Sequence, residues 1–578
     1  MQINNFNKVL FIVGKQNHKR LFLIGILLFI SGILEALSIG ALFPLIELIV
    51  NKNEKSQIFD IFLNLFNFKD EYFQNSLNIL IYSLIIIFSG KILFQAFTSK
   101  FWSKYLYDLQ SNISLALLKK YLSMDYSFHV ENNSSQLIKN VQIETNNFTQ
   151  FILAPFFQLL ADLFIVSSIL TILFILNFKT AFFIIIFFAI AYFILKILTR
   201  RSIQKSGAIR FTLEGARLKE IQQGLSGIKE IKLGGLENIF LNNYDNLNKN
   251  YTNSLSKFIF LGQLPRLWYE ISGVLIILIF LLFLNNTQAQ NDFLNFVPLL
   301  GIYGMAAFKL LPSVNRITSS IQSLNFNIKL ITKIYNDLNL VNNSKYKKND
   351  IEKNISFSHA IEIKNINFSY NYSSELVLDD LNLKIDKGEC IGIVGSSGSG
   401  KTTLLDILSG LLIPTNGDIS VDGISIFENI TSFRSIVGYV SQFIYLQDDT
   451  LDKNITFSMP NSFNKQKLEE VKKLSLIDEF SEKLPSKGMT IIGENGISLS
   501  GGQRQRIGIA RALYRDPEIL IFDEATSALD TVSEESIIKN VGKLKRRKTM
   551  IIITHRKSTL KDCDKIYTLK EGKLYLEK

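Results

Sequence analysis

The run Gly395-Ser396-Ser397-Gly398-Ser399-Gly400-Lys401-Thr402 has the residue types and spacing needed to bind phosphate. It follows an apolar strand pattern at 390–394 and precedes a helical pattern at 403–412. Glycines in such a loop let backbone amides close around phosphate oxygens, while the lysine reaches the β- and γ-phosphates and the threonine hydroxyl binds Mg²⁺. Because average residue usage would give the bare pattern in about one chain in a hundred of this length, we interpret it, with Thr403, as an ATP site.

Two acidic residues, Asp523 and Glu524, follow a second apolar strand pattern at 519–522. Phosphate chemistry with Mg²⁺ uses one carboxylate near the metal and another that polarises the attacking water. A strand ending in two acids is a weak indication alone, but its distance after a phosphate-binding loop makes it a strong one. We expect Asp523 to lie near Mg²⁺ and Glu524 to be catalytic.

A third motif, Leu499-Ser500-Gly501-Gly502-Gln503, lies between these two and leads into a helical pattern at 504–514. A serine and two glycines at a helix start present a hydroxyl and backbone amides to an anion. An isolated motif of this kind could cap any helix, so its meaning depends on its neighbours.

Together these motifs resemble the cassette of the ATP-binding cassette (ABC) transporter family, and the resemblance covers the whole soluble part of the chain. It implies that Tyr370 stacks on adenine and that Gln442 senses Mg²⁺ and contacts the membrane domain. It also implies that His555 contacts the γ-phosphate, that 527–530 form the D-loop, and that Glu494 lies in an exporter-specific loop. A buried core histidine is the alternative for His555.

The same resemblance predicts the site residues as a set. The catalytic residues are Glu524 and His555. The metal-binding residues are Thr402, Gln442 and Asp523. The remaining ATP contacts come from Tyr370, the loop from Gly395 to Thr403, and Ser500, Gly501, Gly502 and Gln503. Because family members place Ser500 against ATP held by Lys401 of another chain, a homodimer with ATP and Mg²⁺ as cofactors is expected.

Composition indicates that a membrane domain precedes the cassette. The chain has 578 residues, of which 47% are hydrophobic and 46 are Phe, and its mean hydropathy is +0.20. A single core stops growing near 250–300 residues, and the apolar residues concentrate before about residue 325. A membrane-spanning helix needs about 20 apolar residues. Six candidates are found at 21–50, 77–97, 151–176, 181–198, 258–284 and 293–311.

The net charge of +12 fits a membrane surface better than nucleic acid. Lys and Arg crowd 8–20, 100–139 and 200–232, whereas 177–180 and 285–292 contain Lys179 as their one basic residue. The positive-inside rule therefore places both termini in the cytoplasm of a multi-pass protein of the bacterial inner membrane. No small-residue cleavage site follows the first apolar run, so a removable signal peptide is not expected. Cys390 and Cys563 are expected to be free, reduced thiols.

The predicted fold is an all-α, six-helix transmembrane domain at 1–330, a linker at 331–357 and an α/β P-loop ABC domain at 358–578. The polar stretches 98–150 and 199–257 are long and helix-compatible, which resembles the exporter type of ABC transporter, with coupling segments at 121–128 and 236–245. The segment 58–66 shows helical spacing of apolar residues. It is interpreted either as an amphipathic helix on the outer membrane surface or as one packed on its own spans.

Four basic residues in or beside the apolar spans bear on the substrate: Lys91, Arg266, Lys309 and Arg316. A cation at mid-bilayer costs about 2.5–3.5 kcal/mol, so the four are predicted to line a cavity for an anionic substrate. Alternatively, Lys91 snorkels to an interface, Arg316 is solvated and Arg266 pairs with Glu270 one turn later.

The membrane half also resembles bacterial lipid-linked oligosaccharide flippases in the segments Leu264-Pro265-Arg266 and 309–316. This resemblance implies an anionic polyprenyl-diphosphate glycan as substrate, although Lys91 and Lys309 stand where arginines are expected, which removes bidentate geometry. A lipid A-type, multidrug or peptide exporter remains an alternative function. For a peptide exporter, no upstream peptidase domain is expected, because the chain begins at the first span. Another alternative is a soluble ABC ATPase that acts on ribosomes or DNA. Such a protein would have the cassette but not the six membrane spans.

Overall fold

The computed structural model describes residues 3–41, 76–176, 178–286, 293–340, 354–370, 375–457, 464–493, 496, 499–554 and 556–577. The chain divides into two compact units. The first, called here the membrane unit, comprises Met1–Met124 and Glu131–Val341. The second, the ATP-binding unit, comprises Asn342–Lys578 together with Asp125–Val130, which lie within or next to the predicted coupling segment 121–128.

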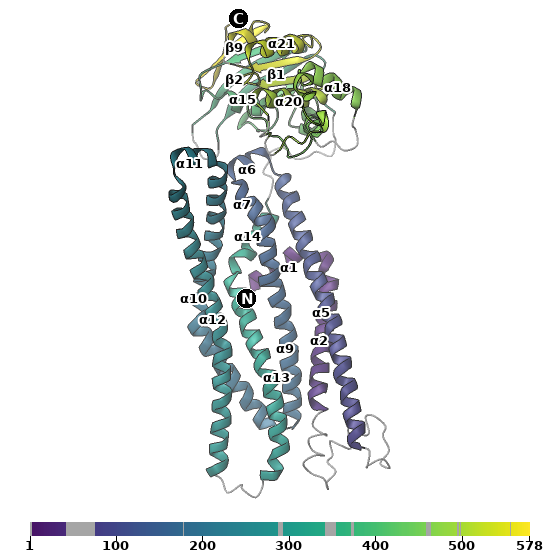
Figure 1. Ribbon diagram of the computed structural model, residues 1–578, viewed down its shortest axis with the longest axis vertical. Helices are drawn as coiled ribbons and strands as arrows, with labels where there is room; N and C mark the ends of the chain where they lie inside the picture. The colour runs from purple at the N-terminus through teal and green to yellow at the C-terminus, as the bar shows by residue number, and fades with distance from the viewer. Residues whose placement is uncertain are drawn as a thin grey trace. The chain divides into compact units, whose positions relative to one another are not determined.

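The membrane unit is a bundle of long helices (Figure 1). They are α2 (His18–Gly40), α5 (Ser76–Leu122), α9 (Ala154–Leu176), α10 (Phe178–Ser226), α12 (Glu237–Asn286) and α13 (Phe293–Phe326). A helix satisfies its own backbone hydrogen bonds, which is why apolar runs fold this way in lipid. Each predicted span falls in one of these helices or the helical turn before it, apart from 42–50, which lie outside the described residues.

Three stretches of the described residues are long and apolar enough to cross a membrane: Lys15–Ser38, Ile81–Leu122 and Ser134–Ile175. Helices α5, α10 and α12 contain 47, 49 and 50 residues. At 1.5 Å per residue they extend about 70 Å, more than twice the thickness of a hydrocarbon core. The helical extensions predicted at 98–150 and 199–257 are therefore largely present, and the predicted outer helix at 58–66 lies outside the described residues.

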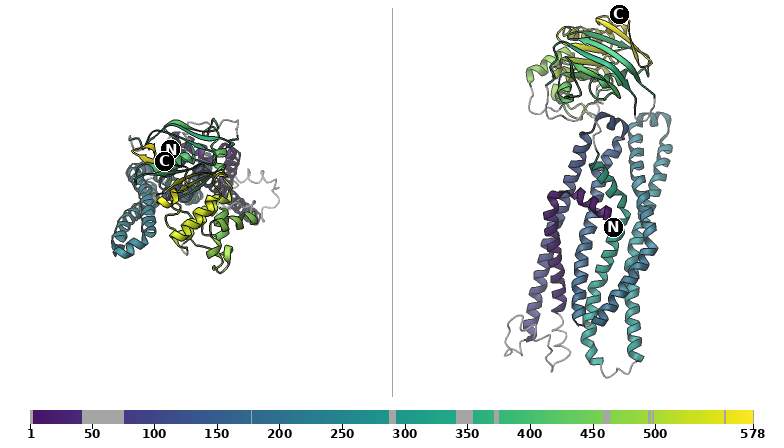
Figure 2. Two further views of the ribbon diagram at one scale, coloured as in Figure 1. Left: turned by 90° about the horizontal axis from the view of Figure 1, so that it is seen from above. Right: turned by 180° about the vertical axis from the view of Figure 1, so that it is seen from behind.

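Apolar contacts hold the long helices together. Helix α9 packs against both α2 and α13, and α10 packs against α12 (Figure 1 and Figure 2). Ile169 and Leu173 of α9 form one buried cluster with Ala306 and Leu310 of α13. Tyr269 of α12 is 1% exposed, and its hydroxyl lies 2.9 Å from Thr318 Oγ1 of α13.

Shorter helices connect the long ones. They are α1 (Ile3–Val13), η1 (Lys15–Asn17), α6 (Tyr126–Glu131), α7 (Ser134–Lys139), η3 (Asn140–Glu144), α8 (Thr145–Phe148), η4 (Thr149–Leu153), α11 (Ile228–Gly234) and α14 (Ile328–Leu338). The second predicted coupling segment, 236–245, consists of Leu236 and the first residues of α12. The short helix α11 precedes it and ends where Gly235 takes a left-handed φ of 58°.

The boundary between the units differs from the sequence prediction. Residues 331–338, predicted as linker, form most of α14, whose Leu330, Ile331 and Ile334 are buried in the membrane unit. On the other side, Ile355 and Phe357 belong to the core of the ATP-binding unit. Residues 331–338 form a helix rather than a linker because their apolar side chains recur at helical spacing within a polar stretch.

The ATP-binding unit contains two sheets. An antiparallel sheet has the order β2 (Leu378–Asp386), β1 (Ala360–Phe368), β4 (Asn416–Val421), β5 (Ile424–Ser425). The other sheet has the order β10 (Lys573–Leu576), β9 (Lys565–Lys570), β3 (Cys390–Val394), β8 (Thr549–Ile553), β7 (Ile519–Asp523), β6 (Val437–Val440). Strands β9, β3, β8, β7 and β6 pair in parallel.

Helices surround the second sheet. They are α15 (Lys401–Leu408), α16 (Ile430–Ser435), α17 (Leu451–Thr456), α18 (Lys465–Leu474), α19 (Asp478–Ser481), η6 (Lys487–Met489), α20 (Gly501–Tyr514), α21 (Thr531–Gly542) and α22 (Lys557–Leu560). Burial on both faces explains the isoleucine-rich strands, since parallel sheets are covered on both sides. Cys390 and Cys563 are buried free cysteines with sulfur atoms 3.7 Å apart.

The register of the parallel strands brings the sequence motifs to one edge. Ile393 of β3 pairs with Ile553 of β8, and Ile553 pairs with Asp523 of β7. Val440 at the end of β6 pairs with Phe522. The loops that follow these four strands therefore lie together at the carboxyl edge of the sheet, where open α/β sheets bind ligands.

Candidate functional site

The phosphate-binding loop joins β3 to α15 and is shaped by its glycines. Gly398 and Gly400 have φ values of 81° and 99°, which other residues rarely adopt. A Cβ on Gly395 would lie 2.5 Å from the carbonyl oxygen of Leu569, so a larger residue does not fit there. Lys401 Nζ donates to the carbonyl oxygens of Gly395 and Ser396, each at 2.9 Å. The loop thus encircles the lysine ammonium.

The residues of this loop fit a nucleotide phosphate. Ser399 Oγ is buried without a hydrogen-bond partner among the described residues, so a polar group of the loop is available for a ligand. Lys401 is 9% exposed, which places a positive charge in a partly desolvated position. Tyr370, predicted to stack on adenine, has its hydroxyl 3.1 Å from Thr403 Oγ1 at the first turn of α15.

Both predicted carboxylates lie at the end of β7 and have side-chain partners from β6 and the loop after it. Tyr439 donates its hydroxyl to Asp523 Oδ2 at 3.0 Å. Gln442 Nε2 donates to Glu524 Oε2 at 2.8 Å. Gln442 and Glu524 were predicted as members of one site, and the structure brings their side chains together. Tyr439 gave no signal in the sequence, because its role depends on strand pairing.

Burial and charge affect the acidic groups near the loop. Burial raises the pKa of Asp523, and the neighbouring Glu524 raises it further, while the Tyr439 hydrogen bond and Lys401 lower it. Burial, followed by repulsion from Asp523, raises the pKa of Asp406 on α15 to about 6. A cation at this site would favour the ionised carboxylates.

The Ser500 motif begins α20 as predicted. Ser500 Oγ accepts from the backbone nitrogen of Gln503, and the Gln503 side chain accepts from the Ser500 nitrogen, which together form a capping box. Farther along α20, buried Gln505 donates to Ser527 Oγ at 3.1 Å and accepts from the Ala528 nitrogen at 2.9 Å. Gln505 therefore links this helix to the predicted D-loop, a role that the motif alone did not reveal. His555 and Glu494 lie outside the described residues.

Each of the four predicted substrate-binding cations has a carboxylate partner. Lys91 and Lys309 both bind Glu35, at 2.8 Å and 2.9 Å. Arg316 binds Asp162 at 2.6 Å, and Arg266 binds Glu270 one turn away on an exposed face at 2.9 Å. The Arg266 pair is the alternative considered from the sequence. Lys91 is 4% exposed, so it does not snorkel within the membrane unit.

These features agree with comparisons to known proteins. Residues 378–527 match the family described as ABC transporter, and residues 21–287 match the ABC transporter transmembrane region. The ATP-dependent lipid A-core flippase of Pseudoalteromonas translucida (strain TAC 125) is 30% identical over 467 residues, which cover 79% of this chain and 78% of that protein. The chain belongs to the ABC transporter family.

Two further similarities support this assignment. The lipid A-core flippase of Haemophilus influenzae (strain 86-028NP) is 40% identical over 216 residues, 37% of each chain. A bacterial Atm1-family ABC exporter, solved with ATP bound, has a TM-score of 0.76 at 21% identity and covers 94% of this chain and 93% of its own. That likeness shows the fold. The protein is a multi-pass ABC exporter that couples ATP hydrolysis to translocation.

Proposed function

We propose that this ABC exporter flips a polyprenyl-diphosphate-linked oligosaccharide across the bacterial inner membrane, with both termini in the cytoplasm. The observation that carries the proposal is the group formed by Glu35, Lys91 and Lys309, called here the lysine pair site. One carboxylate there serves two lysines, so the site has a formal excess of one positive charge. An anionic substrate group would balance it.

The lysine pair site is stronger evidence for an anionic substrate than Arg266 and Arg316 are, because Glu35 and Lys91 are buried. Glu35 and Lys91 are each 4% exposed, and Lys91 and Gln95 also donate hydrogen bonds to Ser38 and Glu35. Lys309 remains 42% exposed and can reach a ligand. Ionisable groups inside a membrane domain are costly and therefore indicate function.

Arg266 and Arg316 contribute differently. Each faces one carboxylate, so each pair is formally neutral. Asp162 is fully buried and holds Arg316 through both carboxylate oxygens, while Gln158 also donates to it. Arg316 is 45% exposed, and we assign to it a supporting contact with the substrate.

Lipid A-core is the second candidate substrate, because the relatives reported above are named for it. An excess positive charge suits any anionic glycolipid. The resemblance of 264–266 and 309–316 to oligosaccharide flippases is what favours the diphosphate-linked glycan.

The ATP site supports a division of roles. Lys401 and the loop amides would hold the phosphates, while Thr402, Gln442 and Asp523 would hold Mg²⁺, which supplies charge neutralisation when bound. No group of three or more His, Cys, Asp or Glu side chains that could hold a metal ion occurs in the described part of the chain, and Mg²⁺ usually keeps several water and phosphate ligands. Glu524, oriented by Gln442, would polarise the attacking water, and His555 would contact the γ-phosphate.

The exporter is proposed to act as a homodimer. Apolar side chains are exposed around α11 and the adjoining helix ends, a surface that a second copy could cover. They are Leu225, Ile228, Leu233, Leu236, Ile239 and Leu241.

Liposomes that contain the full-length protein test the substrate. ATP-driven flipping of a fluorescent polyprenyl-diphosphate glycan, lipid A and a cationic drug is measured side by side. Lys309→Gln removes the excess charge and should lower flipping of the diphosphate lipid about tenfold, the effect of losing one charge-assisted contact. Basal ATP hydrolysis should remain. Lys309→Arg should retain flipping.

Lys196→Gln is the matched control, because Lys196 also lies in a long helix but its ammonium lies over the rings of Tyr192 and Phe193. Replacing Arg266 and Arg316 together by Ala should reduce flipping more than basal hydrolysis. Normal flipping by Lys309→Gln would contradict the lysine pair site. Transport of lipid A without the diphosphate glycan would establish the second candidate.

A further inference from the structure

Glu534 is a buried carboxylate at the first turn of α21, just after the predicted D-loop at 527–530. It is 3% exposed. Its Oε1 accepts hydrogen bonds from Thr526 Oγ1 and Thr559 Oγ1, each at 3.0 Å. Its Oε2 pairs with Arg556. Within the described residues, the Glu534 carboxylate thus connects Thr526, which precedes β8 in the sequence, to Arg556 and Thr559, which follow it.

Arg556 extends this connection to the backbone of the D-loop. Its Nη2 donates to the carbonyl oxygen of Ser527 at 2.8 Å, and its backbone nitrogen donates to Thr554 Oγ1 at 3.0 Å. Arg556 directly follows His555 in the sequence. Arg556 therefore links the predicted D-loop to Thr554 at the end of β8.

The opposite side of the D-loop is held by Gln505 of α20, which contacts Ser527 Oγ and the Ala528 nitrogen. The same helix begins at Ser500. The D-loop is accordingly fixed between the Ser500 helix on one side and the Glu534–Arg556 pair on the other.

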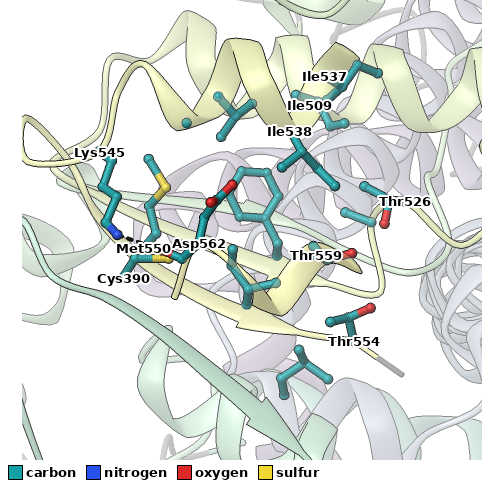
Figure 3. Close-up of a pocket in the computed structure, with 16 residues that line it drawn as sticks. Cys390, Ile509, Thr526, Ile537, Ile538, Lys545, Met550, Thr554, Thr559 and Asp562 are labelled. Atoms are coloured by element: carbon teal, nitrogen blue, oxygen red, sulfur yellow. Dashed lines mark hydrogen bonds between the residues drawn. The ribbon is translucent and has the colours of Figure 1, made fainter. Parts of the chain in front are cut away.

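A small cavity adjoins these hydrogen bonds. A cavity of about 50 Å³ lies beneath α21 and is lined by Ile537 and Val541, with Thr526, Thr554 and Thr559 among its other lining residues. In Figure 3 these three threonines lie at one end of the cavity, away from Lys545 and Cys390. The Asp530 side chain caps α21 by accepting from the Ser533 nitrogen, and the hydrogen bonds of Glu534 add directional contacts beside the cavity.

We propose that Glu534 is a positioning residue that holds the predicted D-loop against Arg556 and Thr559 in one arrangement for hydrolysis. A buried carboxylate is costly unless it is paired and hydrogen-bonded, and three donors meet that requirement here. Glu534 touches neither the phosphate-binding loop nor Tyr370 in the contacts described, so ATP binding does not depend on it. The step that depends on it is cleavage after ATP has bound.

The test uses Glu534→Gln in the full-length protein in lipid nanodiscs. The side chain keeps its shape but loses the charge that pairs with Arg556. The kcat for ATP hydrolysis should fall about tenfold, which corresponds to weakening one charge-assisted interaction. The KM for ATP and the affinity for a non-hydrolysable analogue should stay within about twofold, and the melting temperature should change little.

Glu518→Gln is the matched control. Glu518 makes an exposed ion pair with Lys387 at 3.1 Å in the same unit, and its replacement should leave kcat unchanged. An unchanged kcat in Glu534→Gln, or equal losses of analogue affinity and melting temperature, would overturn the proposal.

Arg556→Lys provides a second, independent variant because it retains the charge but loses the forked donor. Its kcat should also fall with KM preserved, and the double variant should be no slower than the slower single variant. Additive losses in kcat would contradict a shared positioning role, since they would mean that Glu534 and Arg556 act separately.

Discussion

Glu524 has an unusual backbone conformation that its position at the end of β7 imposes. Its φ is 46°, in the left-handed region, and its backbone nitrogen donates to the carbonyl oxygen of Ile553 at 3.0 Å. A non-glycine residue in this region stores strain of about 1–3 kcal/mol, which surrounding structure must offset. The turn places the carboxylate within reach of Gln442 while Asp523 faces Tyr439.

Glu524→Gln is expected to lower kcat for ATP hydrolysis by about 10²–10⁴-fold, the contribution of a positioned general base. The amide keeps the shape of the side chain but does not accept a proton from water. Binding of ATP, measured with a fluorescent analogue, should be retained. Near-normal hydrolysis would remove Glu524 from the proposed role, and Glu518→Gln again serves as the control.

Asp406 gives a prediction about pH. Its pKa is raised from the ordinary value of 3.8 to about 6, mainly by burial and then by Asp523. The folded state therefore favours the protonated form, and this contribution to stability is present at low pH and lost as pH rises through about 6. At neutral pH the ionised group destabilises the fold.

Asp406→Asn should accordingly raise the melting temperature of the nucleotide-free protein at pH 7.5. The gain should shrink at pH 5 and vanish only well below pH 3.8, where Asp406 is protonated in both the folded and the unfolded states. The exposed Asp386→Asn is the control. A gain that is equal at pH 7.5 and pH 5 would show that ionisation of Asp406 is not its cause.

At the scale of elements, a close backbone approach in the membrane unit occurs where α10 crosses the end of α13. A Cβ added to Gly207 would lie 1.9 Å from the carbonyl oxygen of Phe326. Three residues later, Arg210 donates to Asn327 Oδ1 at 3.0 Å, at the bend between α13 and α14. The glycine lets the two backbones meet, and the arginine fixes the bend.

Gly207→Ala should destabilise the protein by about 1–3 kcal/mol, because a backbone carbonyl cannot move aside easily. The temperature at which the detergent-solubilised protein aggregates should fall. Gly215→Ala is the matched control in the same helix, since its added Cβ would lie 3.8 Å from Lys139 Nζ. That change should be neutral or stabilising, as alanine favours helix more than glycine does. Equal stability of both variants would contradict the close crossing.

For the whole molecule, the main expectation is an ATP site shared between two copies. Ser500 and Lys401 begin different helices of one cassette, and the family resemblance assigns them to different ATP molecules of a homodimer. A chain with one cassette would then form two identical composite sites.

Mixing Lys401→Ala chains with Ser500→Arg chains tests this arrangement. Each variant alone should trap no nucleotide with vanadate. Random pairing should restore about a quarter of the wild-type trapping, because half of the dimers would contain one intact site of two. No recovery after subunit exchange, confirmed by differently tagged chains, would mean that the sites are not shared.

The sequence alone indicated most of the proposed ATP-site residues because their motifs are local. The spacing of Gly395 to Thr402 and the carboxylates after a strand specify chemistry within a few residues, and apolar runs about 20 residues long specify spanning helices. The resemblance correctly indicated an ABC exporter. The predicted domain boundary at residue 330 left out α14, because this helix has only 11 residues and is amphipathic, so it does not form an apolar run long enough to span a membrane.

Tertiary structure decided which distant residues share a contact. Glu35 serves Lys91 and Lys309 from positions far along the chain, Gln505 reaches the D-loop, and Glu534 joins Thr526 to Arg556. Their sequence neighbours give no sign of these partners. The physical reason is that a buried charge must be compensated by whatever group the fold brings within about 3 Å, and helix packing and strand register set that proximity.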